Sequence, residues 1–432
     1  MKRVYGIIGL LFWGIYGMSQ PLSLQQYRQR VLDYNQEIKQ SQEAVKAALY
    51  TLKSIRTGFF PRVDIAGNYS YQIENVEFMS GVDLKHDNYS VEAGLVQNVY
   101  AGSGLRKQYE IARIQEAIAR LGEEYTVDNV VYAADVNYWT VAANRDLYRI
   151  ALRFVDIVRE LFDIVDKRFV EGAISRTDVL MVQARLKEAE LQLNTSETNY
   201  RTAIQALNVM MGEEAGRPIV LADSIRQPMA VPSLYDLPLV LENRPDYRIA
   251  QQEIEIARLQ TRLVKANYLP NLAVGIKENW GTTLINVDGE KRFSTIAFAN
   301  VNIPVFYWGE RRHNVRLSET QEETRELERS KLLDQIRLDL SNAWVNLTEA
   351  LKKINIVDSS LEIARHNLIL NTFSYNEGKL PVIDVLSAQV TWLQAFTNVV
   401  SANYQYKVAL AEYERILGGL LPEGRIFKEG KN

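Results

Sequence analysis

The side chains that most often carry enzymatic chemistry are scarce or scattered in this chain. It has no cysteine, which excludes disulfides, thiolate catalysis and a lipid anchor on an N-terminal cysteine. Its three histidines, His86, His313 and His366, lie far apart, and no His-Glu-x-x-His motif joins any two of them. We therefore expect no catalytic residue, no metal site and no cofactor, and the sequence indicates a protein that is not an enzyme.

One glycine-rich segment partly matches a dinucleotide-binding loop. Gly102-Ser103-Gly104 follows an expected strand and opens an expected helix, as such a loop does. However, Lys107 stands where the third glycine of that loop belongs. We therefore expect no dinucleotide at this position.

Two acids follow glycine turns at matching places in the two halves of the chain. Asp178 and Asp384 each lie six residues after a glycine, near the expected start of a helix. An acid in the first helical turn stabilises the positive end of the helix, and Ser175-x-x-Asp178 fits a capping box. Capping is the role we favour for Asp178. Pro381 replaces the serine before Asp384, which leaves that carboxylate available for another role.

The whole chain repeats itself over a period the size of a domain. Phe59–Ile65 returns as Tyr268–Val274, and Gly172–Leu180 returns as Gly378–Leu386, with offsets of 209 and 206 residues. This period is far longer than that of a solenoid repeat, so it indicates a duplicated unit. The expected organisation is a first repeat at 20–212, a proline-rich crossover at 213–243, a second repeat at 244–418 and a tail at 419–432.

Composition and the N-terminus indicate an exported protein. The chain is 47% hydrophobic and 24% charged with a net charge of −3, so no basic surplus suggests nucleic acid. Lys2 and Arg3 precede an apolar run from Val4 to Met18, which is typical of a signal peptide at 1–19, cleaved near Ser19. As a helix this run would rise only about 22 Å, short of the roughly 30 Å hydrocarbon core. No later segment is long and apolar enough to span a membrane as a helix, so any embedded part must consist of strands.

Most of the mature chain is expected to be helical. Apolar residues form a heptad seam over Leu147–Ile164, and no proline lies within Ser103–Gly172, which predicts a helix of about seventy residues. A second long helix is expected over Gly309–Glu377. Heptads that alternate mostly larger with mostly small side chains occupy Val179–Met210 and Val385–Ile416. We therefore predict two long antiparallel helical hairpins, with tips at the two glycine turns.

Four segments break the helical pattern, two in each repeat. Residues 62–73, 88–99, 270–280 and 294–305 alternate apolar with polar side chains, most weakly in the last. Their lengths of about ten to fourteen residues suit tilted membrane strands, although soluble β-hairpins would alternate in the same way. Aromatic residues at the strand–helix junctions favour a membrane interface, where a ring has one wet and one apolar side. These residues are Phe59, Phe60, Tyr100, Tyr268, Phe306, Tyr307 and Trp308.

Four strands are too few to close a membrane barrel. An open sheet edge in lipid is prohibitively costly, because its backbone groups find no partner there. Single-chain barrels start at about eight strands. If the strands are embedded, at least two copies of the chain must pool them.

Together these features resemble the TolC-type outer-membrane efflux protein family, the outer membrane factors of tripartite efflux and type I secretion systems. The most specific are the turns Gly172–Leu180 and Gly378–Leu386, each Gly-x₅-Asp-Val-Leu and each followed by a long alanine-rich heptad. Asn243-Arg244-Pro245-Asp246 also resembles the family pattern, whereas the first repeat has Asn35-Gln36-Glu37-Ile38 there. Many relatives are lipoproteins, and this chain lacks the cysteine.

The resemblance implies a mainly α fold with a membrane β-barrel portion. A homotrimer would form a twelve-stranded barrel on an α-helical tunnel, in the outer membrane of a Gram-negative-type bacterium with a long periplasmic portion. The implied function is a passive exit duct gated at its periplasmic tip. The implied partners are a periplasmic adaptor, outer-membrane lipid and an inner-membrane pump of the resistance-nodulation-division, ABC or major-facilitator type, with no nucleic acid.

The resemblance also implies roles for the tips. Acids in the second-repeat turn ring the periplasmic entrance in the family, which makes Asp384 the leading gate residue, with Asp178 and Ser387 as further candidates. Ser387 replaces a second family acid, which weakens any ring. Three carboxylates around a narrow pore would attract cations and repel one another. The residues expected to dock an adaptor are Glu171, Gly172, Ala173, Ile174, Glu377, Gly378, Lys379 and Leu380.

Two alternatives stay open at this point. Arg168, Tyr375 and Lys379 either tie neighbouring helices at the tip or form a solvated face. The chain as a whole is either the duct or a soluble periplasmic coiled-coil adaptor or scaffold. The four strands and their aromatic junctions favour the duct, because an adaptor would carry small β-barrel and lipoyl-like modules that we do not find.

Overall fold

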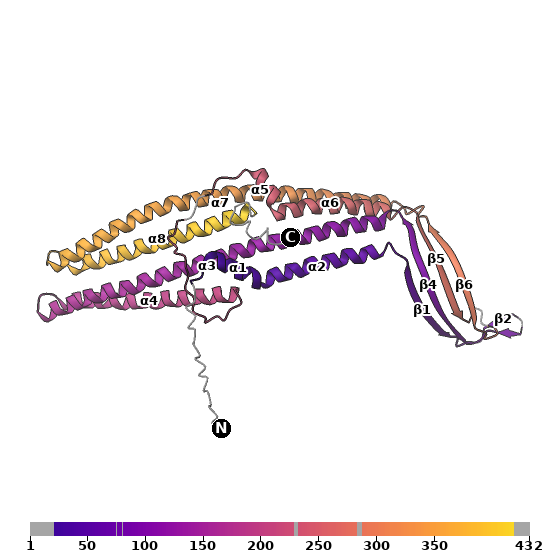
Figure 1. Cartoon of the computed structure of the whole chain (residues 1–432), viewed down its shortest axis with the longest axis horizontal. Coiled ribbons are helices and arrows are strands. Elements are labelled where there is room, and N and C mark those ends of the chain that lie inside the picture. The colour runs from indigo at the N-terminus through magenta and orange to yellow at the C-terminus, as the bar shows by residue number, and fades with distance from the viewer. Residues whose placement is uncertain (1–20, 75, 80, 229–231, 283–286, 419–432) are drawn as a thin grey trace, which may run out of the picture. The chain divides into compact units, whose positions relative to one another are not determined.

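The computed structural model describes residues 21–74, 76–79, 81–228, 232–282 and 287–418 (Figure 1). The expected signal peptide and the tail lie outside these residues. Among the helices that are described, none combines the length and the apolar character needed to cross a membrane.

Both halves of the sequence follow the same order of elements, apart from the small strands β2 and β3 of the first half. The first half contains α1 (Leu24–Tyr34), α2 (Gln36–Thr57), β1 (Arg62–Tyr71), β2 (Glu77–Met79), β3 (Val82–Asp83), β4 (Asp87–Ala101), α3 (Gly104–Val170) and α4 (Arg176–Met210). The second half contains α5 (Leu237–Asn243), α6 (Pro245–Ala266), β5 (Asn271–Gly281), β6 (Arg292–Asn302), α7 (Glu310–Asn376) and α8 (Val382–Ile416). The expected fold class, long helical hairpins with four antiparallel strands, is confirmed.

The long helices have equal lengths in the two halves. α3 and α7 contain 67 residues each, and α4 and α8 contain 35 each. No proline interrupts any of these four helices, and heptads run through almost the whole of α4 and α8, which explains these lengths. Larger and small side chains pack together between the helices. Phe154, Val158 and Ala189 form one buried cluster, and Trp392 packs against it.

The chain divides into two compact units, and each unit draws on both halves of the sequence. Unit 1 comprises residues up to 35, 129–234 and 342–415, and unit 2 comprises 36–128, 235–341 and the residues from 416. Unit 1 therefore holds both hairpin tips with helices α1, α4 and α8. Unit 2 holds the strands with helices α2, α5 and α6.

Each repeat also has a helix break that the sequence analysis did not place. α1 ends at Tyr34, the next residue Asn35 has a φ of −52° and a ψ of 130° that are not helical, and α2 starts at Gln36. In the second half, Arg244 has φ −73° and ψ 118° between α5 and α6. Pro245 explains the second break, because the residue before a proline is pushed out of the helical region.

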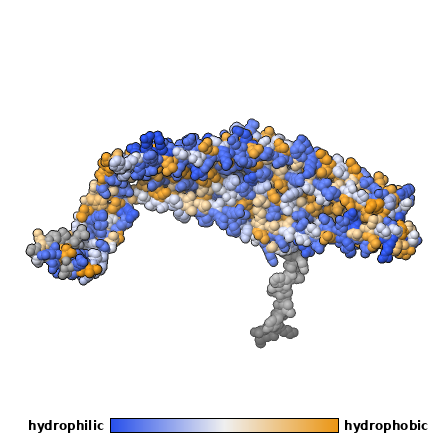
Figure 2. Space-filling model, turned by 180° about the vertical axis from the view of Figure 1, so that it is seen from behind, coloured by the Kyte–Doolittle hydropathy of each residue, from blue (hydrophilic) through white to orange (hydrophobic). Residues whose placement is uncertain are grey.

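Unit 2 contains one antiparallel sheet with the strand order β1-β4-β5-β6. Its strands lie within a few residues of the expected segments. Pairing places Val63, Leu95, Ile276 and Ala297 in one row, so these apolar side chains share a face. Many apolar residues of the sheet are exposed, including Ile65, and Figure 2 shows hydrophobic residues on the sheet at its left.

The other face of the same sheet is more polar. Glu92 and Lys277 lie there, and the Nζ of Lys277 is 2.8 Å from Oε1 of Glu92. A sheet with one mostly apolar and one more polar face suits a wall between lipid and water. Between β1 and β4 the chain forms the small hairpin β2–β3.

Candidate functional site at the hairpin tips

Both hairpin tips turn on a glycine in the left-handed region. Gly172 has φ 75° and Gly378 has φ 71°. At the first tip, the amide of Gly172 donates to the carbonyl of Phe169 at 2.9 Å, and the amide of Ala173 donates to that of Arg168 at 2.8 Å. This pair of bonds is a Schellman motif, and the second tip repeats it. The expected helix-ending role of these glycines is confirmed.

The two acids after the turns have different surroundings. Asp178 takes part in a capping box with Ser175 at the start of α4, as expected, and its Oδ2 lies 3.0 Å from the serine Oγ. Asp384 lies half-buried in the first turn of α8. Its side chain makes no hydrogen bond or ion pair with any residue that the structure describes. Ser387, one turn further, is exposed. Of these three, Asp384 has a carboxylate that can stabilise the start of α8 but is not bound in a capping box.

Arg168 joins the first hairpin to the second. Its guanidinium donates to the backbone carbonyls of Tyr375 at 3.0 Å and of Asn376 at 2.8 Å, at the end of α7. The same group stacks over the ring of Tyr375, 4.6 Å from the centroid. The tie suggested for these two residues is therefore present. Lys379 does not take part, and it is exposed.

An apolar cluster lies beneath this tie. Tyr375 is 3% exposed. Burial raises the pKa of its hydroxyl and is the main cause of the shift, whereas the nearby Arg168 acts to lower this pKa. Both hairpins contribute to the cluster, so their tips pack against each other within unit 1. The buried members are Leu161, Val165, Val182, Tyr375, Val382, Val385 and Leu386.

The residues expected to dock an adaptor form the outer surface of the two turns. Glu171, Ala173, Glu377 and Lys379 are exposed, as are the two turn glycines. Leu380 is half-buried, and Ile174 packs against the apolar cluster. Ile174 is therefore only partly accessible to a partner.

The junction aromatics lie in unit 2 and are mostly exposed. Trp308 is 90% exposed and Phe306 69%, and their rings meet edge to face at 5.0 Å. Tyr268 is half-buried, and its hydroxyl donates to Oε1 of Glu310 at 3.0 Å. Exposed rings beside the ends of strands are what a membrane interface requires.

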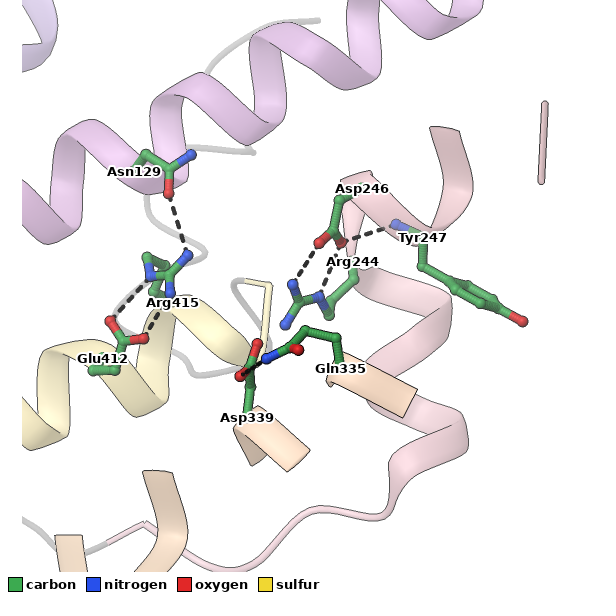
Figure 3. A network of polar contacts seen from close by, with 8 residues as sticks. All are labelled: Asn129, Arg244, Asp246, Tyr247, Gln335, Asp339, Glu412 and Arg415. Atoms are coloured by element: carbon green, nitrogen blue, oxygen red, sulfur yellow. Dashed lines mark hydrogen bonds and ion pairs between the residues drawn. The ribbon is translucent and has the colours of Figure 1, made fainter. Parts of the chain in front are cut away.

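The motif that opens the second repeat has a structural role in unit 2. Nε of Arg244 lies 2.9 Å from Oδ1 of Asp246, which also accepts the backbone amide of Tyr247 at 2.9 Å (Figure 3). Arg244 is buried. Asn243-Arg244-Pro245-Asp246 therefore fixes the start of α6. Figure 3 also shows Arg415 of unit 1 between Asn129 and Glu412.

Several buried polar groups of unit 1 were not predicted from the sequence. Arg28 of α1 is paired with Asp135 of α3, and both are buried. Lys407 of α8 donates to the carbonyl of Gln227 at 2.7 Å and stacks over Trp139, and burial lowers its pKa to about 8. A signal was available, because Asp135 interrupts the apolar run from Val130 to Val136.

The fold is that of TolC-like outer-membrane channels. Residues 27–213 and 237–419 match the family model described as outer membrane efflux protein, and the chain belongs to that family. It is therefore an efflux channel of the outer membrane, of the kind found in tripartite efflux and type I secretion systems, with a periplasmic helical domain, and it is not an enzyme. Membership in this family favours the channel over the soluble adaptor or scaffold that the sequence left open.

Relatives and solved structures agree with this membership. The chain is 24% identical to nodulation protein T of Rhizobium leguminosarum bv. trifolii, over 54% of this chain and half (50%) of that protein. It is 23% identical to the outer membrane protein TolC of Salmonella enteritidis, over 97% of this chain and 87% of the relative. The CmeC outer membrane channel of Campylobacter jejuni shares the fold, with a TM-score of 0.79 at 16% identity over 94% of this chain and 88% of that one.

Proposed function

We propose that three copies of this chain form one duct that carries substrates passively from an inner-membrane pump and a periplasmic adaptor to the exterior. Channels of this family form trimers that work with efflux pump components. Each copy would contribute four strands to a twelve-stranded barrel and two helical hairpins to a periplasmic tunnel. Transport would involve no chemistry on the substrate.

The sheet of unit 2 is the observation that carries this proposal. Its outer strands, β1 and β6, are edges, and an edge in lipid leaves backbone groups without partners. Its apolar row, which contains Val63 and Ile276, is suited to lipid, and its opposite face carries the Glu92–Lys277 pair. Pairing β6 of one copy with β1 of the next would close the sheet and place the polar face inside.

The mass of the native particle tests the assembly. Membranes would be fractionated, extracted with mild detergent and measured by light scattering corrected for detergent. We expect an outer-membrane particle of about three times the mass of the mature chain, given that the full chain is 49.4 kDa. A monomer under these conditions would refute the shared barrel, and a dimer would refute its twelve strands.

We further propose that the tips form the gate. Opening requires neighbouring hairpins to separate, and the Arg168 tie on the end of α7 opposes this movement. Three copies of Asp384 would face the narrow entrance and bind cations there. Asp178 is bound in its capping box and Ser387 carries no charge, so both would contribute less. The exposed turn residues around Glu171 and Lys379 would receive the adaptor.

Single-channel recording of the purified protein tests the gate. Arg168→Gln is expected to raise the open probability, because it removes two charge-assisted hydrogen bonds and a ring contact. Arg176→Gln is the matched control, because it removes the same charge from the same exposed tip. If both variants behave like the parent, Arg168 does not hold the gate.

Block by multivalent cations tests the carboxylate ring separately. Asp384→Ala is expected to weaken the block, whereas Asp166→Ala, an exposed acid near the first tip, is expected to leave it unchanged. Cation block that survives Asp384→Ala would remove this residue from the pore.

A further inference from the structure

A groove in unit 2 lies where the second strand pair meets the helices. It has a volume of about 540 Å³ and lies between the end of α6, the segment after β6 and the first turns of α7. Pro304, Val305 and Phe306 line its apolar side. Arg312 and Arg316 line its cationic side, with Arg311 beside them. Apolar and cationic groups therefore share one cavity.

The acids around this groove are already engaged. Oε1 of Glu319 lies 3.0 Å from Nζ of Lys265, and Glu310 accepts the hydroxyl of Tyr268. Among the residues that the structure describes, none forms an ion pair with the side chains of Arg311, Arg312 and Arg316. Three arginines thus line the groove without an ion pair to any carboxylate of the described residues.

The first half of the chain shows how the same positions look when they are neutralised. α3 and α7 have equal lengths and start 206 residues apart, so Arg106 corresponds to Arg312 and Glu110 to Arg316. In α3, Nε of Arg106 lies 3.2 Å from Oε1 of Glu110, and Nζ of Lys107 lies 2.8 Å from the other oxygen. The second copy thus has two arginines in place of an ion pair.

Two arginines one turn apart near a helix start are unfavourable without an anion. Like charges at this spacing repel, and cations near a helix N-terminus oppose its dipole. An anion bound between Arg312 and Arg316 would remove both penalties. The apolar wall with Phe306 and the highly exposed Val305 would then contact an apolar portion of the same ligand.

We propose that this groove binds the phosphate headgroup of an anionic phospholipid from the periplasmic leaflet, with Arg312 and Arg316 on the phosphate and Phe306 on the acyl chain. A lipid fits better than free phosphate, because free phosphate would leave the apolar wall without a partner. The inference rests on the proposed placement of the sheet in the membrane. There the groove lies at the depth of the headgroups, next to the exposed ring of Trp308.

Native mass spectrometry of the detergent-solubilised protein tests this site. Phosphatidylglycerol and phosphatidylcholine with identical acyl chains would be titrated into the parent protein and into Arg312→Gln/Arg316→Gln. The control is Arg106→Gln/Lys107→Gln, which removes the same number of cations from the neutralised positions of α3. Each cation near an anionic surface contributes about 1 kcal/mol, so we expect the arginine variant to bind phosphatidylglycerol about 10-fold to 30-fold more weakly. The control and phosphatidylcholine binding are expected to stay unchanged.

Four results would overturn the proposal. Equal binding of the two lipids would show that no anionic headgroup is recognised, and an equal loss in the control would show a general charge effect. Displacement by millimolar inorganic phosphate would identify a soluble anion as the ligand. Dissociation of the oligomer in Arg312→Gln/Arg316→Gln, with lipid binding unchanged, would show that a second copy of the chain fills the groove. The same spectra also give the number of chains in the particle. A trimer that binds both lipids equally would contradict only the lipid site, whereas a monomer would contradict the proposed function.

Discussion

Neutralising Asp135 should release helix α1 from unit 1. Nε of Arg28 lies 2.6 Å from Oδ1 of Asp135, and the second carboxylate oxygen is bonded to Nη2 of the same guanidinium. The two side chains are 5% and 2% exposed. Removing one partner of such a buried pair leaves the other charge without compensation, at a cost of about 3–5 kcal/mol.

The second acid near Arg28 places the expected value at the lower end of this range. Glu414 lies 3.4 Å from Nη2 and is 19% exposed, so it compensates part of the charge. We therefore expect Asp135→Asn to cost about 3 kcal/mol. Because α1 has only 11 residues, the loss should appear as local opening of this helix before the whole chain unfolds.

Hydrogen exchange read by mass spectrometry measures that opening. A local loss of about 3 kcal/mol corresponds to an exchange rate about 100-fold higher in peptides from Leu24–Tyr34, with α6 as the internal reference. Glu414→Gln is the control and should cost less than about 1 kcal/mol, because its contact is longer and partly exposed.

A double variant separates the unpaired charge from lost packing. Arg28→Met/Asp135→Val replaces the pair with apolar groups, and we expect α1 to recover to within about 1 kcal/mol of the parent. Unchanged exchange in Asp135→Asn would refute the reasoning. So would a double variant that opens as much as the single one.

Two further predictions concern Lys407 and a glycine turn. Burial lowers the pKa of Lys407 from 10.5 to about 8, so folding disfavours its charged form; this cost is complete below about pH 8 and disappears as the pH rises towards 10.5. Lys407→Met should therefore raise the thermal midpoint more at pH 7 than at pH 10, as measured by circular dichroism. At pH 7 the gain in the free energy of unfolding should reach up to about 3 kcal/mol. An equal shift of the midpoint at both pH values would contradict this. Gly102 and Gly172 both have positive φ, 58° and 75°, but a Cβ at Gly102 would lie 2.5 Å from the carbonyl oxygen of Ala266, whereas one at Gly172 meets nothing within 4 Å. Gly172→Ala should cost about 1 kcal/mol and Gly102→Ala clearly more, and equal thermal midpoints would show that the close contact is absent.

Periodicity predicted the regular elements well. A heptad that continues without proline can only be satisfied by a long helix, and the heptad expected over Val385–Ile416 lies within α8, which is observed at Val382–Ile416. Alternation likewise placed the strands, as with the segment expected at 62–73 and observed at Arg62–Tyr71. Both patterns are local and repeat many times, so single exceptions do not obscure them.

Features that depend on one residue or on a distant partner were harder to predict. The helix break at Arg244 is marked by the proline that follows, but no proline follows Asn35 at the corresponding break of the first repeat. Only the comparison of the two repeats therefore points to the break at Asn35. Arg28 and Asp135 lie 107 residues apart, and no spacing rule links them. The acceptors of Arg168 are backbone carbonyls, which every residue carries, so the sequence suggested Tyr375 as a partner but not the form of the contact.

The carbonyl acceptors of Arg168 have a consequence for acid conditions. An ion pair with a carboxylate is lost when the acid is protonated, at about pH 4 for an ordinary aspartate or glutamate. The carbonyls of Tyr375 and Asn376 have no proton to gain in this range. Acidification of the periplasm would therefore leave the acceptors of this tie between the hairpins unchanged. Closure of the tip thus does not depend on the ionisation of a carboxylate.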